Sequence, residues 1–193
     1  MYEIRLHGLG GEGVVVASEL LGKAAMKQGK WSHSFPFFGT DIRGAAVKAF
    51  TRIDDRPIAI KSYIYKPDTL LIFNDILLSD PDVAVGVSTS TLVLVNTELS
   101  PEVLGESELG KLGAKIIPIK ATELGYQCFN RPIFNTIMLG ALLKVQAVVD
   151  KDILCQVIAE EFPSKLAEAN VAALEKGYQS VERMDGDETS LVS

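Results

Sequence analysis

Apolar residues in the first part of the chain predict a strand, a helix and a second strand. Residues 2–6 predict a first strand, and residues 14–28 repeat apolar positions at helical spacing. Gly29 follows as a helix stop. A second short strand is predicted over residues 31–35, and we expect it to end at Pro36.

Regular alternation of apolar and other side chains begins at residue 45. Residues 45–53 place one set of side chains on one face of a strand and a wetter set, including Lys48 and Arg52, on the other. Residues 54–57 have turn-forming types, and the alternation resumes over residues 58–64. We therefore expect an antiparallel hairpin with one side more polar than the other.

Three short apolar runs follow, separated by segments of helical character. They cover residues 69–73, 92–95 and 115–119. Short apolar strands that alternate with helices are typical of parallel strands in an α/β layer. The predicted fold class is therefore α/β, a single domain with a mostly parallel sheet plus an antiparallel hairpin, flanked by helices.

The last third of the chain is predicted to be helical. Residues 132–149 are apolar almost all round, which indicates a helix buried on several sides. Asp150 and Ser164 are residue types that cap helix N-termini. They are expected to begin two further helices, over residues 151–162 and 165–184.

The composition fits one ordered domain. The chain has 193 residues, of which 47% are hydrophobic, enough for one well-buried core and short for two. We expect the domain to span residues 1–184, followed by a flexible acidic tail at 185–193. No apolar run approaches the ~20 residues of a membrane span. The first residues have the pattern of a strand rather than of a targeting signal, so a cytoplasmic protein without a membrane partner is expected.

The charge balance and the few histidines and cysteines limit the chemistry. A formal net charge of −6 argues against a nucleic-acid surface. Cys128 and Cys155 are the only cysteines and are far apart, whereas iron–sulfur clusters generally take four cysteine ligands. His7 and His33 are the only histidines, and His7 is expected to hydrogen-bond to loop backbone. We predict no metal held by this chain and no catalytic residues.

A glycine-rich run follows the first predicted strand. Gly8, Gly10 and Gly13 have the G-x-G-x-x-G spacing of a turn that opens a helix. A dinucleotide site also needs an acidic residue about 20 residues further on, and residues 31–39 contain none. Glu12 places a negative charge where pyrophosphate would lie. We therefore rank a tight packing turn ahead of a stand-alone NAD(P)-binding oxidoreductase.

Aromatic residues gather around the end of the second predicted strand. Phe35, Phe37 and Phe38 lie in a segment expected to be an irregular loop, with Arg43 shortly after it. The loop either packs onto its own domain or presents aromatic anchors and an arginine to a partner, and we favour the interface. A modest basic cluster is either a solvated strand face or a surface for an anionic ligand or partner. Its members are Arg43, Lys48, Arg52, Arg56 and Lys61.

Several short motifs occur in an order and spacing that resemble a known family. They are His7-Gly8-x-Gly10-Gly11-x-Gly13, Phe35-Pro36-x-x-Gly39, Arg43-Gly44-Ala45, Ala49-Phe50-Thr51-Arg52-Ile53, Tyr65-x-Pro67-Asp68 and Asn135-x-x-x-Leu139-Gly140-Ala141. The set is similar to the gamma subunit, or equivalent domain, of the 2-oxoacid:ferredoxin oxidoreductases, most closely of the pyruvate and ketoisovalerate type. The resemblance covers residues 2–182. The family commonly has Gln where this chain has Glu12.

The resemblance implies an accessory subunit of a complex that oxidatively decarboxylates a 2-oxoacid, reduces ferredoxin and forms an acyl-coenzyme A. It implies that thiamine diphosphate and iron–sulfur clusters are held by alpha-, beta- and delta-type partner subunits, and that coenzyme A arrives near the gamma part. The surface expected to face coenzyme A or a neighbouring chain comprises Gly8, Gly10, Gly11, Gly13 and Arg43. A non-catalytic interaction module of another assembly is the remaining alternative.

Overall fold

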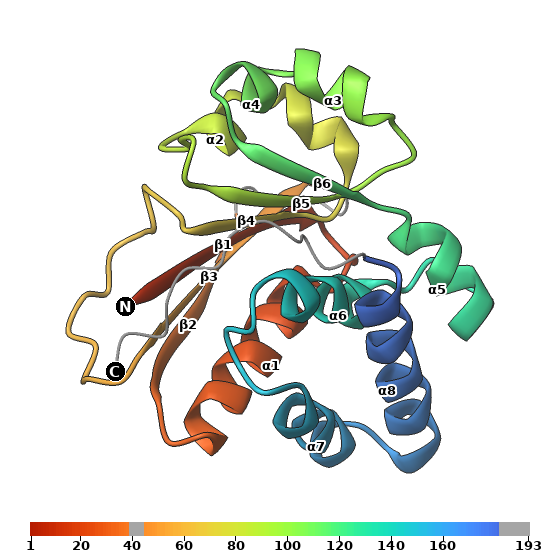
Figure 1. Ribbon diagram of the computed structural model, residues 1–193. Coiled ribbons are helices and arrows are strands. Elements are labelled where there is room, and N and C mark those ends of the chain that lie inside the picture. The colour runs from red at the N-terminus through yellow and green to blue at the C-terminus, as the bar shows by residue number, and fades with distance from the viewer. Residues whose placement is uncertain (39–44, 182–193) are drawn as a thin grey trace, which may run out of the picture.

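A six-stranded sheet forms the centre of the molecule (Figure 1). The computed structural model describes residues 1–38 and 45–181, so Arg43 and the tail predicted over residues 185–193 lie outside the described residues. The strands stand in the order β2-β3-β1-β4-β5-β6. Their bounds are β1 Tyr2–Leu9, β2 Trp31–Phe38, β3 Ala46–Asp54, β4 Thr69–Ile72, β5 Leu92–Asn96 and β6 Lys115–Ile119.

The sheet is parallel on one side of β1 and antiparallel on the other. β4 pairs with β1, β5 with β4 and β6 with β5, all in parallel. β3 runs antiparallel to both β1 and β2. Every residue of β4 is buried, as expected for a short apolar strand covered on both faces. The predicted α/β class with a mixed sheet is confirmed.

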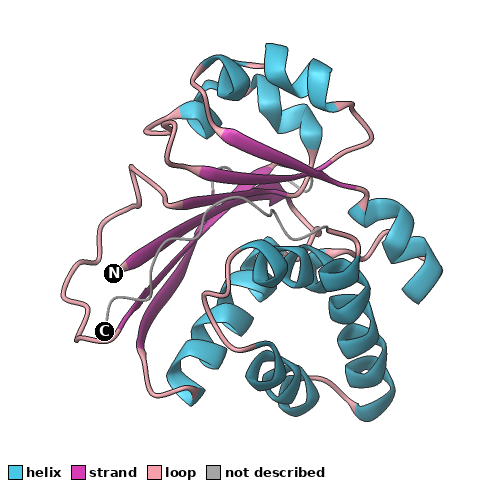
Figure 2. Ribbon diagram, viewed as in Figure 1, coloured by secondary structure: helices cyan, strands magenta, loops and turns pink. Residues whose placement is uncertain are grey.

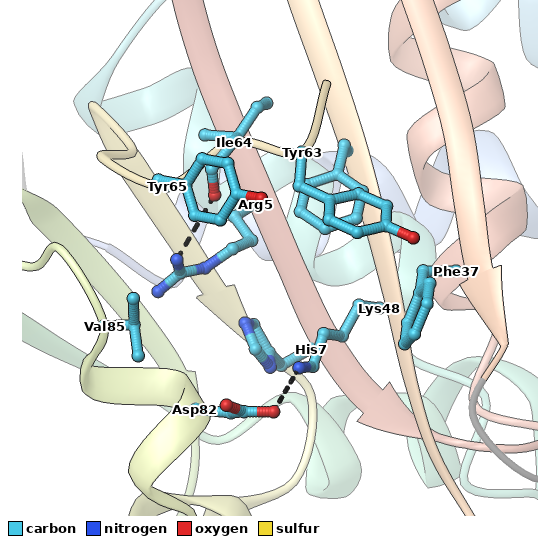
Figure 3. A pocket seen from close by; sticks show the side chains of 10 residues that line it. Arg5, His7, Phe37, Lys48, Tyr63, Ile64, Tyr65, Asp82 and Val85 are labelled. Carbon is cyan, nitrogen blue, oxygen red and sulfur yellow. Dashed lines mark hydrogen bonds and ion pairs between the residues drawn. The ribbon is translucent and has the colours of Figure 1, made fainter. Parts of the chain in front are cut away.

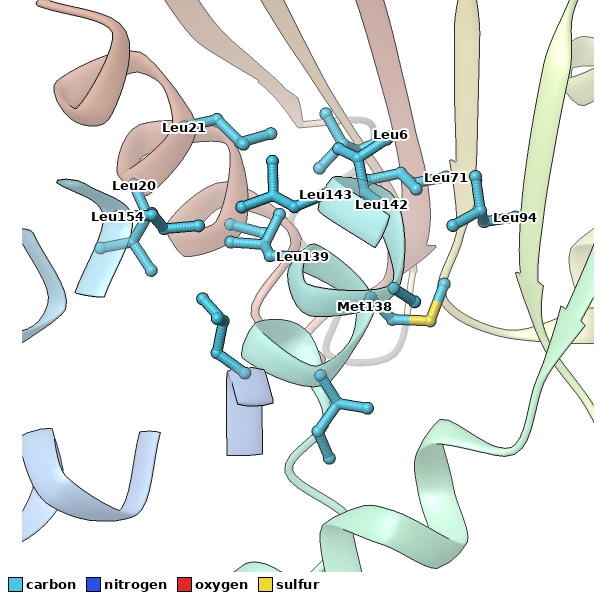
Figure 4. Close-up of a cluster of buried hydrophobic side chains, with 14 of the residues drawn as sticks. Leu6, Leu20, Leu21, Leu71, Leu94, Met138, Leu139, Leu142, Leu143 and Leu154 are labelled. Atoms are coloured by element: carbon cyan, nitrogen blue, oxygen red, sulfur yellow. The ribbon is translucent and has the colours of Figure 1, made fainter. Parts of the chain in front are cut away.

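Long helices pack on one face of the sheet (Figure 2). Val14, Ala17 and Leu21 form the buried stripe of α1 that contacts the sheet. The stretch predicted over residues 132–149 forms a shorter helix, Asn135–Val145, and its residues 135–143 are all buried, which confirms a buried helix there. Figure 4 shows leucines of the sheet and of these helices meeting in one cluster. The helices are α1 Val14–Lys27, α5 Ala121–Phe129, α6 Asn135–Val145, α7 Lys151–Glu161 and α8 Ser164–Gln179.

Helices α6 and α8 cross at very short range because each has a glycine at the contact. A Cβ atom on Gly140 would lie 1.9 Å from the Leu174 carbonyl oxygen, and one on Gly177 would lie 2.0 Å from that of Ile137. Neither position can accept a larger side chain without moving a helix. This contact fixes α8 against the centre of the core.

Shorter helical segments cover the opposite face, above β4, β5 and β6 (Figure 1). They bury Leu77, Val83, Leu104 and Leu109 in a second apolar cluster. Their bounds are η1 Asp75–Ser79, α2 Pro81–Ala84, α3 Pro101–Glu106 and α4 Glu108–Lys111. Within the described ranges, the same face of β1, β2 and β3 is crossed by the irregular segment 55–68 instead of by a helix (Figure 1).

The antiparallel hairpin predicted between residues 45–53 and 58–64 is wrong. Residues 58–64 form no strand, and β3 pairs instead with β1 and β2. The physical reason is that carbonyl groups of this segment bind buried arginines. Ile64 accepts a hydrogen bond from Arg5, and Ser62 accepts one from Arg52.

Two predicted boundaries also move. β2 continues through Pro36 to Phe38, which an edge strand tolerates because one side of its backbone needs no donor. Asp150 caps α7 as predicted, accepting hydrogen bonds from the amides of Asp152 and Ile153. Ser164 is instead the first residue of α8 and makes no side-chain cap.

Candidate functional site

Alternate residues of the three antiparallel strands form two rows on the outer face of the sheet. In the first row Arg5 pairs with Phe50, which pairs with Phe35. Because successive strand residues point to opposite faces, a second row lies two positions further along. The second row consists of His7, Lys48 and Phe37. Both rows point away from the side on which α1 packs.

The members of the two rows other than Phe35 line a pocket of about 250 Å³, which we call the His7 pocket (Figure 3). Figure 3 places the imidazole of His7 close to the pair formed by Lys48 and Asp82. Segment 55–68 and the α2 region supply the remaining walls. These wall residues are Tyr63, Ile64, Tyr65, Asp82 and Val85.

Arg5 is only 4% exposed and connects two walls of the pocket through hydrogen bonds. Its Nη1 donates to the carbonyl of Ile64 at 3.3 Å, and its Nη2 donates to that of Val83 at 2.8 Å. Its Nε has no partner among the described residues. Burial lowers the pKa of Arg5 to about 10, so the guanidinium stays charged at neutral pH.

His7 is deeply buried in the pocket and carries no charge at neutral pH. Its side chain is 2% exposed, and its Nε2 atom has no hydrogen-bond partner in the part of the chain that the structure describes. Burial, followed by the positive charges of Arg5 and Lys48, lowers the pKa of His7 to about 3. The expected hydrogen bond to loop backbone is therefore not made by Nε2.

Lys48 and Asp82 close one end of the pocket. The Lys48 Nζ donates to Asp82 Oδ2 at 2.6 Å, and the hydrogen bond and charge of Lys48 lower the pKa of Asp82. Lys48 also lies over the Phe37 ring, 5.8 Å from its centre. The charged side chains around the neutral His7 are therefore Lys48, Arg5 and Asp82, two positive and one negative, so the pocket is net positive.

Stacked aromatic rings form another wall. The Phe35 and Phe50 ring centres are 5.0 Å apart, those of Phe50 and Tyr63 are 5.4 Å apart, and Phe37 meets Tyr63 edge-on at 5.2 Å. Such contacts each add about 0.5–1.5 kcal/mol beyond area burial. The structure thus brings two predicted interface residues, Phe35 and Phe37, together on β2 instead of in an irregular loop. The side chain of Phe38 lies outside the described residues, as does Arg43.

Arg52 shows that the basic cluster is not simply a solvated face. It is 1% exposed, and its Nε donates to Glu3 Oε1 at 2.7 Å. Its Nη1 donates to the carbonyl of Ser62 and its Nη2 to that of Tyr63. Arg52 therefore anchors segment 55–68, whereas Lys48 faces the His7 pocket.

The glycine loop is a tight strand-to-helix turn. Gly13 precedes α1 with a φ of 78°, a left-handed conformation that favours glycine. A Cβ atom on Gly8 would lie 2.5 Å from Val14 Cγ2 and 2.9 Å from Glu12 Oε2. Gly10 donates its N–H to the carbonyl of Ala45. The remaining predicted member of the loop, Gly11, has a φ of 100°.

Glu12 folds back into the loop and binds it. Its Oε2 accepts from the N–H of Leu9 at 2.6 Å, and its Oε1 accepts from Asn74 Nδ2 at 2.7 Å. The loop therefore binds a carboxylate of its own chain. A phosphate at the same N–H would have to displace Glu12, which argues against the dinucleotide interpretation.

A second, acidic hollow lies at the carboxyl ends of β4 and β5, where ligands bind in many open α/β sheets. Glu12, Asp75 and Glu98 line it, together with the amides Asn74 and Asn96. The carboxylates would repel phosphate groups. This hollow therefore gives no support to a stand-alone NAD(P) site.

Sequence reasoning missed most of the His7 pocket. Arg5, Tyr63 and Asp82 come from three separate segments, and each residue type is ordinary in its local sequence. The usable signal was the pair Arg5 and His7 at alternate positions of a strand, between the apolar residues Ile4 and Leu6. Charged or titratable residues in a buried strand require partners from elsewhere in the fold.

The described residues carry no cluster of three or more His, Cys, Asp or Glu side chains placed to hold a metal ion. Cys128 and Cys155 are separate, partly buried thiols. Burial raises the pKa of Cys155, as expected for a thiol that packs against the core. Across the described ranges, none of the helices is both long and apolar enough to cross a membrane.

Comparison with known proteins gives consistent results. Residues 3–180 match the family model of pyruvate ferredoxin/flavodoxin oxidoreductase. The chain is 43% identical over 178 residues to the pyruvate/ketoisovalerate oxidoreductases common subunit gamma of Thermococcus kodakarensis, covering 92% of this chain and 96% of the relative. It is 40% identical to the pyruvate synthase subunit PorC of Methanothermobacter thermautotrophicus, covering 95% and 98%.

A solved structure extends the similarity to three dimensions. The crystal structure of pyruvate oxidoreductase subunit PORC from Thermotoga maritima aligns with a TM-score of 0.83 at 34% identity, covering 94% of this chain and 97% of that one. The match includes both the parallel and the antiparallel part of the sheet, since it spans nearly the whole chain. The chain therefore belongs to the pyruvate ferredoxin/flavodoxin oxidoreductase family.

Proposed function

We propose that this chain is the accessory gamma subunit of a multi-subunit 2-oxoacid:ferredoxin oxidoreductase of the pyruvate or ketoisovalerate type. The observation that carries the proposal is similarity over nearly the whole length of proteins that are themselves named as such subunits. The complex would oxidatively decarboxylate a 2-oxoacid, pass the electrons to ferredoxin and form an acyl-coenzyme A.

The residue inventory supports a non-redox role for this chain within the complex. Cys128 and Cys155 are too few to supply the four thiolates that an iron–sulfur cluster generally takes. We therefore assign the clusters and thiamine diphosphate to the alpha-, beta- and delta-type subunits. This chain contributes surfaces that hold those subunits and bring substrates to them.

The outer face of β1, β2 and β3 is the proposed subunit interface. Phe35 and Phe37 lie there, next to the partly exposed rings of Tyr63 and Tyr65. Aromatic residues beside a few charged groups are typical of interface centres. Phe38 and Arg43 come from the neighbouring part of the sequence and complete the proposed set.

The glycine loop, with Arg43, is proposed to face a neighbouring chain or coenzyme A. The contacts of Glu12 favour the neighbouring chain, because the N–H of Leu9 already binds a carboxylate. Binding of a coenzyme A phosphate at this N–H requires Glu12 to leave. Substitution of Glu12 by Gln should therefore raise coenzyme A affinity in the assembled enzyme only if the loop touches that anion.

Reconstitution tests the proposed function. The complex assembled with this chain should oxidise the 2-oxoacid with ferredoxin, whereas this chain alone with thiamine diphosphate should be inactive. Phe37→Ser should weaken assembly. Val16→Ser, at a 37% exposed apolar residue on α1, serves as the matched control and should leave assembly unchanged. Oxidation of a 2-oxoacid by the isolated chain, or equal assembly of both variants, would contradict the proposal.

A further inference from the structure

The rim of the His7 pocket is unusually apolar for a surface. Tyr65 is 61% exposed, Val85 47% and Tyr63 44%. Ile60, in the same segment as the two tyrosines, is 49% exposed but does not line the pocket. Exposed aromatic and aliphatic side chains around a hollow are typical of a protein–protein contact, in which a central pocket takes an anchor residue.

The floor of the pocket, in contrast, is polar and deeply buried. His7 Nε2 and Arg5 Nε have no hydrogen-bond partner among the described residues, although both side chains are at least nine-tenths buried. Buried polar atoms without partners cost stability. An occupant with a polar group at its tip would satisfy the imidazole of His7, which is at the centre of the lining.

Charge restricts the polar group of the occupant. Arg5 and Lys48 are positive, and the single carboxylate of the lining, Asp82, is already paired with Lys48 at 2.6 Å. A cationic tip would meet two like charges and find no free carboxylate there. An oxygen atom is therefore the suitable group. The aromatic wall of Phe37, Phe50 and Tyr63 favours a ring behind that oxygen.

We propose that the His7 pocket receives a tyrosine side chain from a partner subunit, with the ring against the aromatic wall and the hydroxyl at the imidazole of His7. A phenol hydroxyl both donates and accepts, so it pairs with either tautomer of a neutral histidine. A partner surface also covers the exposed rim around the pocket, which a small ligand inside it would leave in water. The inference rests on the proposed function, since it names the partner chemistry of the proposed interface.

Photo-crosslinking in the assembled enzyme tests this inference. A benzophenone-bearing phenylalanine replaces Tyr65 at the rim. The same residue replaces Tyr126 on α5 as a matched control, because Tyr126 is 53% exposed and lies outside the pocket. The expected result is an adduct from position 65 to a partner-subunit peptide that contains a tyrosine. Changing that tyrosine to Phe should then speed dissociation about tenfold, because the buried histidine loses its hydrogen bond.

The outcomes separate this inference from the proposed function. A complex that assembles but gives no partner adduct from position 65, or gives an adduct to coenzyme A, would overturn the tyrosine inference and leave the subunit role intact. Unchanged dissociation after the partner's Tyr→Phe substitution would also overturn it. A chain that never assembles with oxidoreductase subunits would instead refute the proposed function.

Discussion

The buried, neutral His7 makes stability depend on pH in a direction that can be measured. Its pKa is lowered to about 3 in the folded chain, against about 6.5 when unfolded. Below pH 6.5 the unfolded chain therefore binds a proton that the folded chain does not. Stability is lost as pH falls from 6.5 towards 3, and it is retained above that window.

The expected size follows from the same two values. A pH of 5.0 lies about 1.5 units below the pKa of the unfolded histidine, and each unit corresponds to about 1.4 kcal/mol. His7 alone therefore lowers the free energy of unfolding by about 2 kcal/mol between pH 7.5 and 5.0. Arg5, Lys48 and Asp82 face His7 in the pocket. Arg5 and Asp82 keep their charges in that window, because the pKa of Arg5 is about 10 and that of Asp82 is lowered by Lys48.

Urea unfolding of the isolated chain at pH 7.5 and 5.0 measures this loss. A His7→Gln variant removes the titrating group, so its free energy of unfolding should fall by about 2 kcal/mol less than that of the unsubstituted chain over the same interval. His33→Gln is the matched control, since His33 is more exposed and should account for a smaller part of the loss. Equal losses in the unsubstituted chain and the His7 variant would refute the neutral, buried histidine.

Three further changes test other contacts. Glu12→Gln removes the charge that binds the Leu9 N–H, so it should lower the free energy of unfolding, measured by chemical denaturation, by about 1–2 kcal/mol. The control Glu98→Gln, at an exposed carboxylate, should change the same quantity by less than about 0.5 kcal/mol. Gly140→Ala should cost about 1–3 kcal/mol or more because α6 and α8 must separate, and Gly105→Ala, in open space on α3, should be neutral or stabilising by up to about 1 kcal/mol. Lys48→Met should raise the pKa of Asp82, as followed by carboxyl NMR, because its hydrogen bond and charge are lost; an unchanged pKa would show that the pair does not form.

Local patterns predicted most elements because the forces that set them are local. The helical stripe beginning at Val14 and the N-cap at Asp150 both appear as expected. The strand predicted over residues 58–64 is wrong because the segment alternates like a strand while its carbonyl groups accept hydrogen bonds from Arg5 and Arg52. Those contacts depend on the fold as a whole and leave no local pattern.

The candidate site was only partly predictable for the same reason. Phe35 and Phe37 could be singled out because aromatic residues were dense in one short segment. The Nη1 and Nη2 atoms of Arg5 donate to carbonyl groups 59 and 78 positions later in the chain, and no local spacing indicates such partners. The contact of Glu12 with Asn74, 62 positions away, likewise leaves no local sequence pattern.

Native mass measurement of the complex purified through this chain is the most direct test of the subunit assignment. We expect the chain to be bound to larger oxidoreductase subunits that carry iron and thiamine diphosphate, and removal of the chain to abolish ferredoxin reduction by the 2-oxoacid. A chain found only as a monomer or with copies of itself, with no iron-bearing partner, would contradict the subunit assignment.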